Sequence, residues 1–169
     1  MMIWKHCNFR EEKKDVSLRA PIGTWLATYG ESGLYRLAVL EKTHDPTDGN
    51  NCPKWLETAW DAFWDGRPFD VTLCTEKKPS PSTEAVWNVV LEIPFGTTRT
   101  YGEVAISAGI SHGARAVGSI MRSNPWALFI PCHRVLGKNG KLCGYGGKAG
   151  IGLKALLIEY ERGKKGKAG

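Results

Sequence analysis

The residues with the clearest chemical potential lie in one short segment, Ile-Pro-Cys-His-Arg-Val at positions 130–135. A thiolate is a strong nucleophile, and a thiol ionises at neutral pH only with a base or a positive charge nearby. His133 and Arg134 directly follow Cys132 and are the local candidates for these roles. The apolar run before Cys132 predicts a buried strand or extended segment, in which adjacent side chains point to opposite faces. We therefore expect His133 to reach Cys132 through a water molecule more easily than directly.

Two other uses of this thiol stay open. A cysteine in apolar surroundings has a raised pKa and is inert, so Cys132 also fits a buried structural thiol. A metal site is the third alternative, but Cys132 and His133 are adjacent and Cys143 has no C-x2-C partner. Further side chains of the types that bind zinc lie near the N-terminus: His6, Cys7, His44 and Cys52. Their spacing matches no zinc motif, and we expect no required metal.

Two short helices upstream must help to position the cysteine. Thr100 and Glu103 have the spacing of a capping box, in which each side chain satisfies a free backbone donor of the first helical turn. Gly109 stands where a helix calls for a left-handed C-terminal residue, and Ser111 can cap a second helix that Asn124-Pro125 ends. Two short helices joined by a tight turn predict a helix-turn-helix.

Small residues gather in the second of these helices: Gly113, Ala114, Ala116 and Gly118. Glycine costs about 1 kcal/mol relative to alanine inside a helix, so a close contact should compensate for it. That contact is either with a neighbouring helix or with a nucleic-acid groove, and spacing alone does not decide between them. Arg115 lies among these small residues.

The first part of the chain has the pattern of a small α+β unit. Residues 24–42 predict two strands around a Gly-Glu-Ser-Gly turn, with Trp25, Ala27 and Tyr29 on one face. A helix that Gly66 ends is predicted by apolar residues at helical spacing: Trp55, Leu56, Ala59, Trp60, Phe63 and Trp64. Residues 69–74 can add a further strand.

Charge and two prolines at 76–82 predict a domain boundary. We expect an N-terminal structural domain at 1–78 and a C-terminal domain at 79–169. The second domain begins with an amphipathic helix at 83–93, whose apolar side comprises Val86, Val89, Val90 and Ile93. The fold class is therefore α/β (α+β): a β-hairpin or sheet with a helix, followed by a mostly helical domain that contains the helix-turn-helix.

The composition of the chain limits which kinds of partner and which cellular compartment we expect. The 169 residues carry a net charge of +6, which suits a polyanionic partner but is weak evidence alone. No stretch approaches the roughly 20 apolar residues that cross a bilayer, so we expect no membrane association. The N-terminus turns charged where a secretion signal is apolar, which predicts an intracellular protein of the nucleus or cytoplasm. We expect the five cysteines to be free thiols in that reducing compartment.

Four motifs, in this order and at close spacing, resemble those of the O6-alkylguanine-DNA alkyltransferases, or methylated-DNA–protein-cysteine methyltransferases. They are IPFGTTRTYGEVA, RAVGSIMRSNP, IPCHRV and GYGG. The resemblance runs from about Thr83 to Glu161 and is specific, whereas the first half of the chain shares only a general likeness. It implies a DNA repair protein that needs no cofactor. Such a protein binds duplex DNA as a monomer through the minor groove, with little sequence preference.

The resemblance also implies a reaction and the residues that perform it. The protein flips O6-alkylguanine, and O4-alkylthymine as well, out of the duplex and moves the alkyl group irreversibly to its own Cys132. His133 becomes the water-linked base. Glu161 orients that histidine, or Glu159 if an insertion of about two residues is ignored. Asn124 helps to order the pocket.

The remaining assignments from the resemblance concern DNA and the pocket. Tyr101 rotates the phosphate and assists proton delivery to the departing guanine, and Arg115 fills the space left by the flipped nucleotide. The expected DNA-binding residues are Tyr101, Ala114, Arg115, Ala116, Gly118 and Ser123. The expected pocket residues are Met121, Pro131, Val135, Tyr145 and Gly146.

Two other functions compete with this interpretation. A helix-turn-helix regulator without chemistry explains the charge and the two helices but leaves the Pro-Cys-His-Arg segment without a purpose. A cysteine hydrolase fits poorly, because catalytic cysteine and histidine residues normally meet through the fold and not as neighbours in the chain.

Overall fold

The structure is a computed structural model that describes residues 2–7, 10–40, 52–111, 113–143 and 150–166. The chain divides into two compact units, one of Met1–Lys78 with Pro125–Ala127 and one of Pro79–Asn124 with Leu128–Gly169. The inclusion of residues 125–127 in the first unit was not predicted. Three hydrogen bonds hold this segment to residues 34–37. The Leu37 N–H donates to the Pro125 carbonyl at 2.8 Å, the Ala127 N–H donates to the Leu37 carbonyl at 3.0 Å, and Trp126 Nε1 donates to the Leu34 carbonyl at 2.9 Å.

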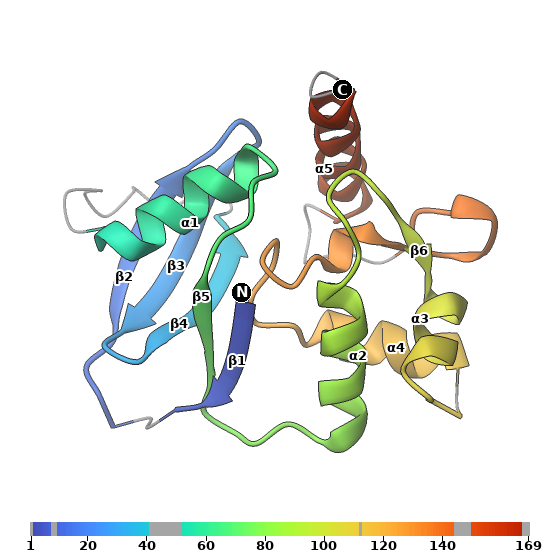
Figure 1. The fold of residues 1–169 in the computed structure, drawn as a ribbon, viewed down its shortest axis with the longest axis horizontal. Helices are drawn as coiled ribbons and strands as arrows, with labels where there is room; N and C mark the ends of the chain where they lie inside the picture. Colours follow the sequence, from blue (N-terminus) through green and yellow to red (C-terminus); the bar gives the residue numbers. More distant parts are fainter. Residues whose placement is uncertain (1, 8–9, 41–51, 112, 144–149, 167–169) are drawn as a thin grey trace. The chain divides into compact units, whose positions relative to one another are not determined.

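A five-stranded mixed sheet forms the first unit, in the order β1-β5-β4-β3-β2 (Figure 1). The strands are β1 (Met2–His6), β2 (Lys14–Arg19), β3 (Thr24–Gly30), β4 (Gly33–Val39) and β5 (Val71–Thr75). β5 is parallel to both β1 and β4, and the other pairs are antiparallel. The predicted hairpin is confirmed as β3 and β4. β1 and β2 were missed, because only Val16 and Leu18 of β2 are buried and charged residues surround them.

Helix α1 (Lys54–Trp64) lies against one face of this sheet (Figure 1). Trp60 contacts the edge of Trp25 with ring centroids 6.3 Å apart, and its Nε1 donates to the Arg19 carbonyl at 2.8 Å. Gly66 follows the helix with φ of 68°, as expected for a residue that ends it. Trp55, which was predicted to belong to the apolar stripe, is instead 37% exposed on the first turn and touches Tyr29.

The prediction that all five cysteines are free thiols is wrong for two of them. Cys7 and Cys74 form a disulfide, and the described free cysteines are Cys52, Cys132 and Cys143. β1 and β5 are adjacent parallel strands in which Lys5 pairs with Cys74. This register brings the Cα atoms of Cys7 and Cys74 to 5.4 Å, within the range that a disulfide spans.

The second unit is mostly helical. It contains α2 (Pro81–Leu91), β6 (Arg99–Thr100), α3 (Tyr101–Ser107), α4 (Gly113–Arg122), β7 (Val135–Leu136) and α5 (Gly150–Lys165), with 3₁₀ turns at Cys132–Arg134 and Lys138–Gly140. Helix α2 begins two residues earlier than predicted. Ser80 Oγ accepts the Thr83 N–H at 3.2 Å, and Pro81 is tolerated at the first position because its missing N–H has no helical partner there.

The helix-turn-helix is confirmed. Thr100 and Glu103 form both hydrogen bonds of the capping box that begins α3, and Gly109 has φ of 65° in the turn to α4. The short strands β6 and β7 pair in parallel, with Thr100 opposite Leu136. This pairing brings the start of α3 beside the chain that leaves Cys132. Among the described helices, none combines the length and hydropathy needed to span a bilayer.

Candidate active site around Cys132

A tight double turn, and not the predicted extended segment, presents Cys132. Pro131 has φ of −78° and ψ of 63°, and the Cys132 N–H donates to the Ile130 carbonyl at 2.7 Å. These values define an inverse γ-turn, which the fixed φ of proline favours. Cys132–Arg134 then form one 3₁₀ turn, in which the Arg134 N–H donates to the Pro131 carbonyl at 2.9 Å. The turn leaves Cys132 only 6% exposed.

Asn124 connects the end of α4 to this turn. Its Nδ2 donates to the Ile130 carbonyl at 3.0 Å and to Cys132 Sγ at 3.4 Å. One amide group thus holds both the backbone of the γ-turn and the sulfur. Asn124 was predicted to help order the pocket, and the structure places its amide in contact with the cysteine.

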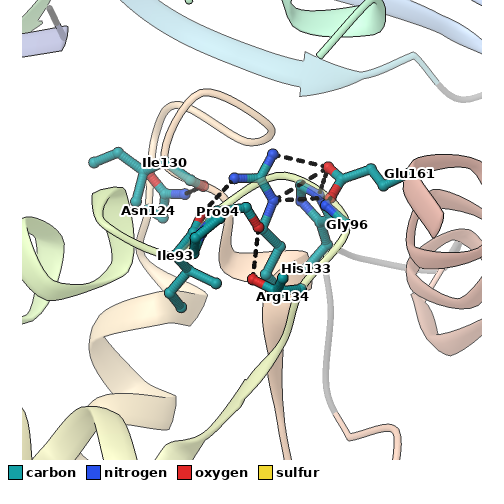
Figure 2. Close-up of polar contacts among 9 residues, drawn as sticks. Ile93, Pro94, Gly96, Asn124, Ile130, His133, Arg134 and Glu161 are labelled. Carbon is teal, nitrogen blue, oxygen red and sulfur yellow. Dashed lines mark hydrogen bonds and ion pairs between the residues drawn. The ribbon is translucent and has the colours of Figure 1, made fainter. Parts of the chain in front are cut away.

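His133 and Glu161 meet in the interior of the second unit, although 28 residues separate them. His133 Nε2 lies 2.7 Å from Glu161 Oε1, and the two side chains are 0% and 3% exposed. Figure 2 shows the His133 ring and the Arg134 guanidinium both directed at the Glu161 carboxylate. Glu159, the alternative partner, lies on the exposed face of α5. The contact with His133 therefore belongs to Glu161.

The sequence suggested Arg134 as a positive charge beside Cys132. In the structure its guanidinium instead binds Glu161. Its Nε and Nη2 donate to the two oxygens of Glu161 at 2.9 and 3.0 Å, and its Nη1 donates to the Ile93 carbonyl at 2.7 Å (Figure 2). The Gly96 N–H donates to Glu161 Oε2 at 2.9 Å. One carboxylate therefore joins α5, the loop after α2 and the turn that carries Cys132.

The charges of this cluster follow from its partners. Burial alone raises the pKa of Glu161, but hydrogen bonds from His133 and Arg134 and the positive charge of Arg134 lower it to about 2. Burial lowers the pKa of His133, so its ring is neutral at neutral pH. A carboxylate only accepts hydrogen bonds, so Nε2 of His133 carries the proton and Nδ1 is the basic nitrogen.

Lys154 is a buried site residue whose part in the site the sequence analysis missed. Its Nζ donates to the carbonyls of Val135 and Cys143 and, at 3.4 Å, to the Tyr101 hydroxyl. Burial lowers its pKa. One feature of the sequence could have pointed to it: Lys154 lies on α5 beside Leu153 and Leu157, among the residues that the helix buries.

Tyr101 begins α3 and is half-buried. Burial, and then electrostatic repulsion from the nearby Cys132 and Cys143, raise its pKa to about 12. The phenol is therefore protonated at neutral pH. Because Lys154 donates to its oxygen, the phenol hydrogen is available for another acceptor.

The small-residue helix presents an open face. Ala114, Arg115 and Ser123 are exposed. A Cβ built on Gly118 meets no atom of the described residues within 4 Å, which contradicts a tight internal contact at this glycine. Ala116 is partly exposed, and Ser123 Oγ donates to the Ile120 carbonyl at 3.0 Å.

The structure places the other predicted residues as follows. Met121 lies on the buried face of α4, Pro131 makes the γ-turn and Val135 is fully buried. Tyr145 and Gly146 lie outside the described residues. Of the N-terminal ligand types, Cys7 is bonded to Cys74, and His44 also lies outside them. Within the described ranges, no three histidine, cysteine or acidic side chains gather as a metal site would require.

A buried cysteine held by an amide, a His-Glu-Arg cluster behind it and a helix-turn-helix define a class: a nucleic-acid-binding protein with a cysteine-centred reaction site. Residues 81–163 match the family model of the 6-O-methylguanine DNA methyltransferase DNA-binding domain. The methylated-DNA–protein-cysteine methyltransferase of Mycobacterium tuberculosis is 39% identical over 155 residues, which cover 88% of this chain and 92% of that protein. The Methanosarcina barkeri protein of the same name is 37% identical, over 85% of this chain and 94% of its own. The chain belongs to the methylated-DNA–protein-cysteine methyltransferase family.

Solved structures agree in fold with this assignment. The crystal structure of Mycobacterium tuberculosis O6-methylguanine methyltransferase has a TM-score of 0.73 and 33% identity, covering 90% of this chain and 94% of its own. The same protein in complex with DNA has a TM-score of 0.70 and 35% identity, covering 88% and 92%. The family resemblance and the α+β fold predicted from the sequence are confirmed.

Proposed function

We propose that this protein repairs DNA by taking the alkyl group of O6-alkylguanine, and of O4-alkylthymine, onto its own Cys132. Each molecule acts once. The observation that carries the proposal is the position of Cys132, whose sulfur is held by Asn124 in a turn that continues directly into the buried His133–Glu161–Arg134 cluster. Membership of the family supports the substrate class.

His133 acts as the base in this proposal. Its Nδ1 accepts the Cys132 proton through one bridging water, because the Nε2–H is engaged by Glu161. Glu161 stabilises the imidazolium that forms, and Arg134 keeps Glu161 anionic throughout. The amide of Asn124 donates to the sulfur and so favours its thiolate form.

Alkyl transfer is an in-line displacement. The thiolate attacks the alkyl carbon, a carbon–sulfur bond forms, and the bond from that carbon to O6 of guanine breaks. The departing guanine needs a proton, which Tyr101 donates, and Lys154 holds the phenol oxygen in place for this donation. The proton that Cys132 loses balances the proton that the guanine gains. The thioether product is stable, so no turnover follows and no cofactor is consumed.

DNA binding uses the open face of α4. The exposed small residues Ala114 and Gly118 allow the helix backbone to approach the minor groove closely, with little dependence on sequence. Exposed Arg115 enters the stack where the damaged nucleotide has rotated out. We further propose that the protein acts as a monomer inside the cell.

Intact-mass spectrometry after incubation with duplex DNA that contains O6-methylguanine tests the function. We expect the mass to rise by one methyl group in place of a hydrogen, located on Cys132. The Cys132→Ala variant should bind the same DNA without any mass change. An unmodified wild-type protein with an intact fold would reject the chemistry and leave a DNA-binding regulator. Release of free product over many turnovers would instead indicate a hydrolase.

A further inference from the structure

A second arginine lies on the open face of α4, at the opposite end from Arg115. Arg122 is exposed in the last turn of the helix. It follows Arg115 by seven residues, so both side chains leave the same face, about 20° apart in rotation and about 10 Å apart along the axis. Exposed Ser119 lies between them on this face.

Among the residues that the structure describes, no acidic side chain pairs with either arginine. Helix α4 contains no acidic residue, and within the described ranges neither guanidinium forms an ion pair. By contrast, Arg134 is bound by Glu161 and Arg67 by Asp65. The α4 face therefore offers two positive charges that no described side chain pairs, at a fixed separation that suits the regularly spaced charges of a nucleic-acid backbone.

Arg122 also stands next to the reaction site. It precedes Asn124, which holds Cys132, by two residues. Its charge acts on the Tyr101 hydroxyl, where it opposes the rise in pKa that burial and the two cysteines cause. An extruded base that reaches Tyr101 and Cys132 must place its own phosphate near the edge of this site, within reach of a long exposed side chain at the end of α4.

We propose that Arg122 binds the phosphate beside the extruded nucleotide and so holds the damaged base over Cys132. This inference rests on the proposed function and adds a residue to it. Arg115 and Arg122 then have different roles on DNA. Arg115 replaces the base inside the stack, and Arg122 binds the backbone of the nucleotide that has left it. The planar guanidinium donates two parallel hydrogen bonds to phosphate oxygens, which fixes orientation as well as position.

Rates of Cys132 alkylation on three substrates test the proposal: a duplex with O6-methylguanine, the single strand of the same sequence, and free O6-benzylguanine. We expect Arg122→Ala to lower the ratio of the duplex rate to the free-base rate about tenfold, which is about 1.4 kcal/mol. The salt dependence of the duplex reaction should weaken by about one unit of the logarithmic slope, as for one lost phosphate contact. Arg122→Lys should recover part of the ratio, because it keeps the charge without the bidentate geometry.

Alkylation rates on single-stranded DNA distinguish the roles of the two arginines. A phosphate is present in both DNA forms, so the Arg122→Ala loss should persist on single-stranded DNA. The Arg115→Ala loss should shrink there, because a single strand has no paired stack to refill. Arg67→Ala removes one exposed positive charge of the first unit and is the control for net charge, with no change expected in the ratio.

The outcomes distinguish this inference from the proposed function. Equal loss on duplex and free base, or an unchanged salt slope, would overturn the role of Arg122 while wild-type alkylation upholds the chemistry. If wild-type protein formed no adduct with duplex or with free base, the proposed function itself would fail. Circular dichroism melting of each variant identifies any that fails to fold, and Arg122→Lys then supplies the comparison.

Discussion

Removing the carboxylate of Glu161 should destabilise the second unit strongly. Two independent arguments give the size of this loss in stability. The pKa of Glu161 falls from 4.5 to about 2 on folding, which corresponds to roughly 3 kcal/mol. Breaking a buried ion pair by deleting one partner costs about 3 to 5 kcal/mol, because the other charge remains buried. We therefore expect Glu161→Ala to lower the free energy of unfolding by about 3 to 5 kcal/mol.

The double-mutant cycle with Arg134 is the sharper form of this prediction. Arg134→Ala should also be costly, because it leaves Glu161 buried without the donors at 2.9 and 3.0 Å. The double variant leaves neither charge of the pair behind, so its cost should be less than the sum of the single costs by at least about 2 kcal/mol. Urea unfolding followed by circular dichroism at pH 7 measures all three variants. Glu159→Ala, which removes an exposed glutamate two residues away, is the matched control and should change stability by less than about 0.5 kcal/mol.

The loss of Glu161 should also lower the rate of alkylation. Glu161→Ala should slow alkylation of Cys132 even by the free base O6-benzylguanine, because His133 loses the acceptor that fixes its tautomer. A cost for Glu161→Ala as small as that of Glu159→Ala would refute the reasoning about the buried cluster. Single costs that add within about 0.5 kcal/mol would refute the coupling to Arg134.

Three further predictions concern other parts of the molecule. The urea midpoint should fall as pH is lowered from about 6.5 towards 2, because the lowered pKa values of His133 and Glu161 make the folded state bind fewer protons than the unfolded state; an unchanged midpoint between pH 6.5 and 4 would contradict this. Cys7→Ser opens a crosslink across a sequence separation of 67 residues and should cost about 4 kcal/mol. Titration of the denatured, unreduced protein should find three thiols, and finding five would rule the disulfide out. Gly118→Ala should raise stability by up to about 1 kcal/mol, since its Cβ meets open space, yet slow the reaction on duplex DNA; an unaffected duplex rate would remove this face from the DNA contact.

Local features of the fold were predictable from the sequence. The capping box at Thr100 and Gly109 identified the start of α3 and the turn after it, and alternating apolar residues around the Gly-Glu-Ser-Gly turn identified the β3–β4 hairpin. These signals span a few residues, because caps and turns are made by neighbouring backbone groups. Strand β1 had no such signal. It lies at the edge of the sheet and pairs with β5, which is far away in the chain.

The order and spacing of the motifs around Cys132 also identified the family and named Asn124, His133 and Glu161 as site residues. They did not indicate that Arg134 binds Glu161, that Lys154 holds Tyr101 or that Cys7 meets Cys74. Sequence by itself determined which chemical groups this protein has and, at the capping box of Thr100 and at Gly66 and Gly109, where single helices begin or end. Only the tertiary structure decided which charges share a buried carboxylate, because burial removes water as a partner and leaves each ionised group to be satisfied by whatever distant segment packs against it.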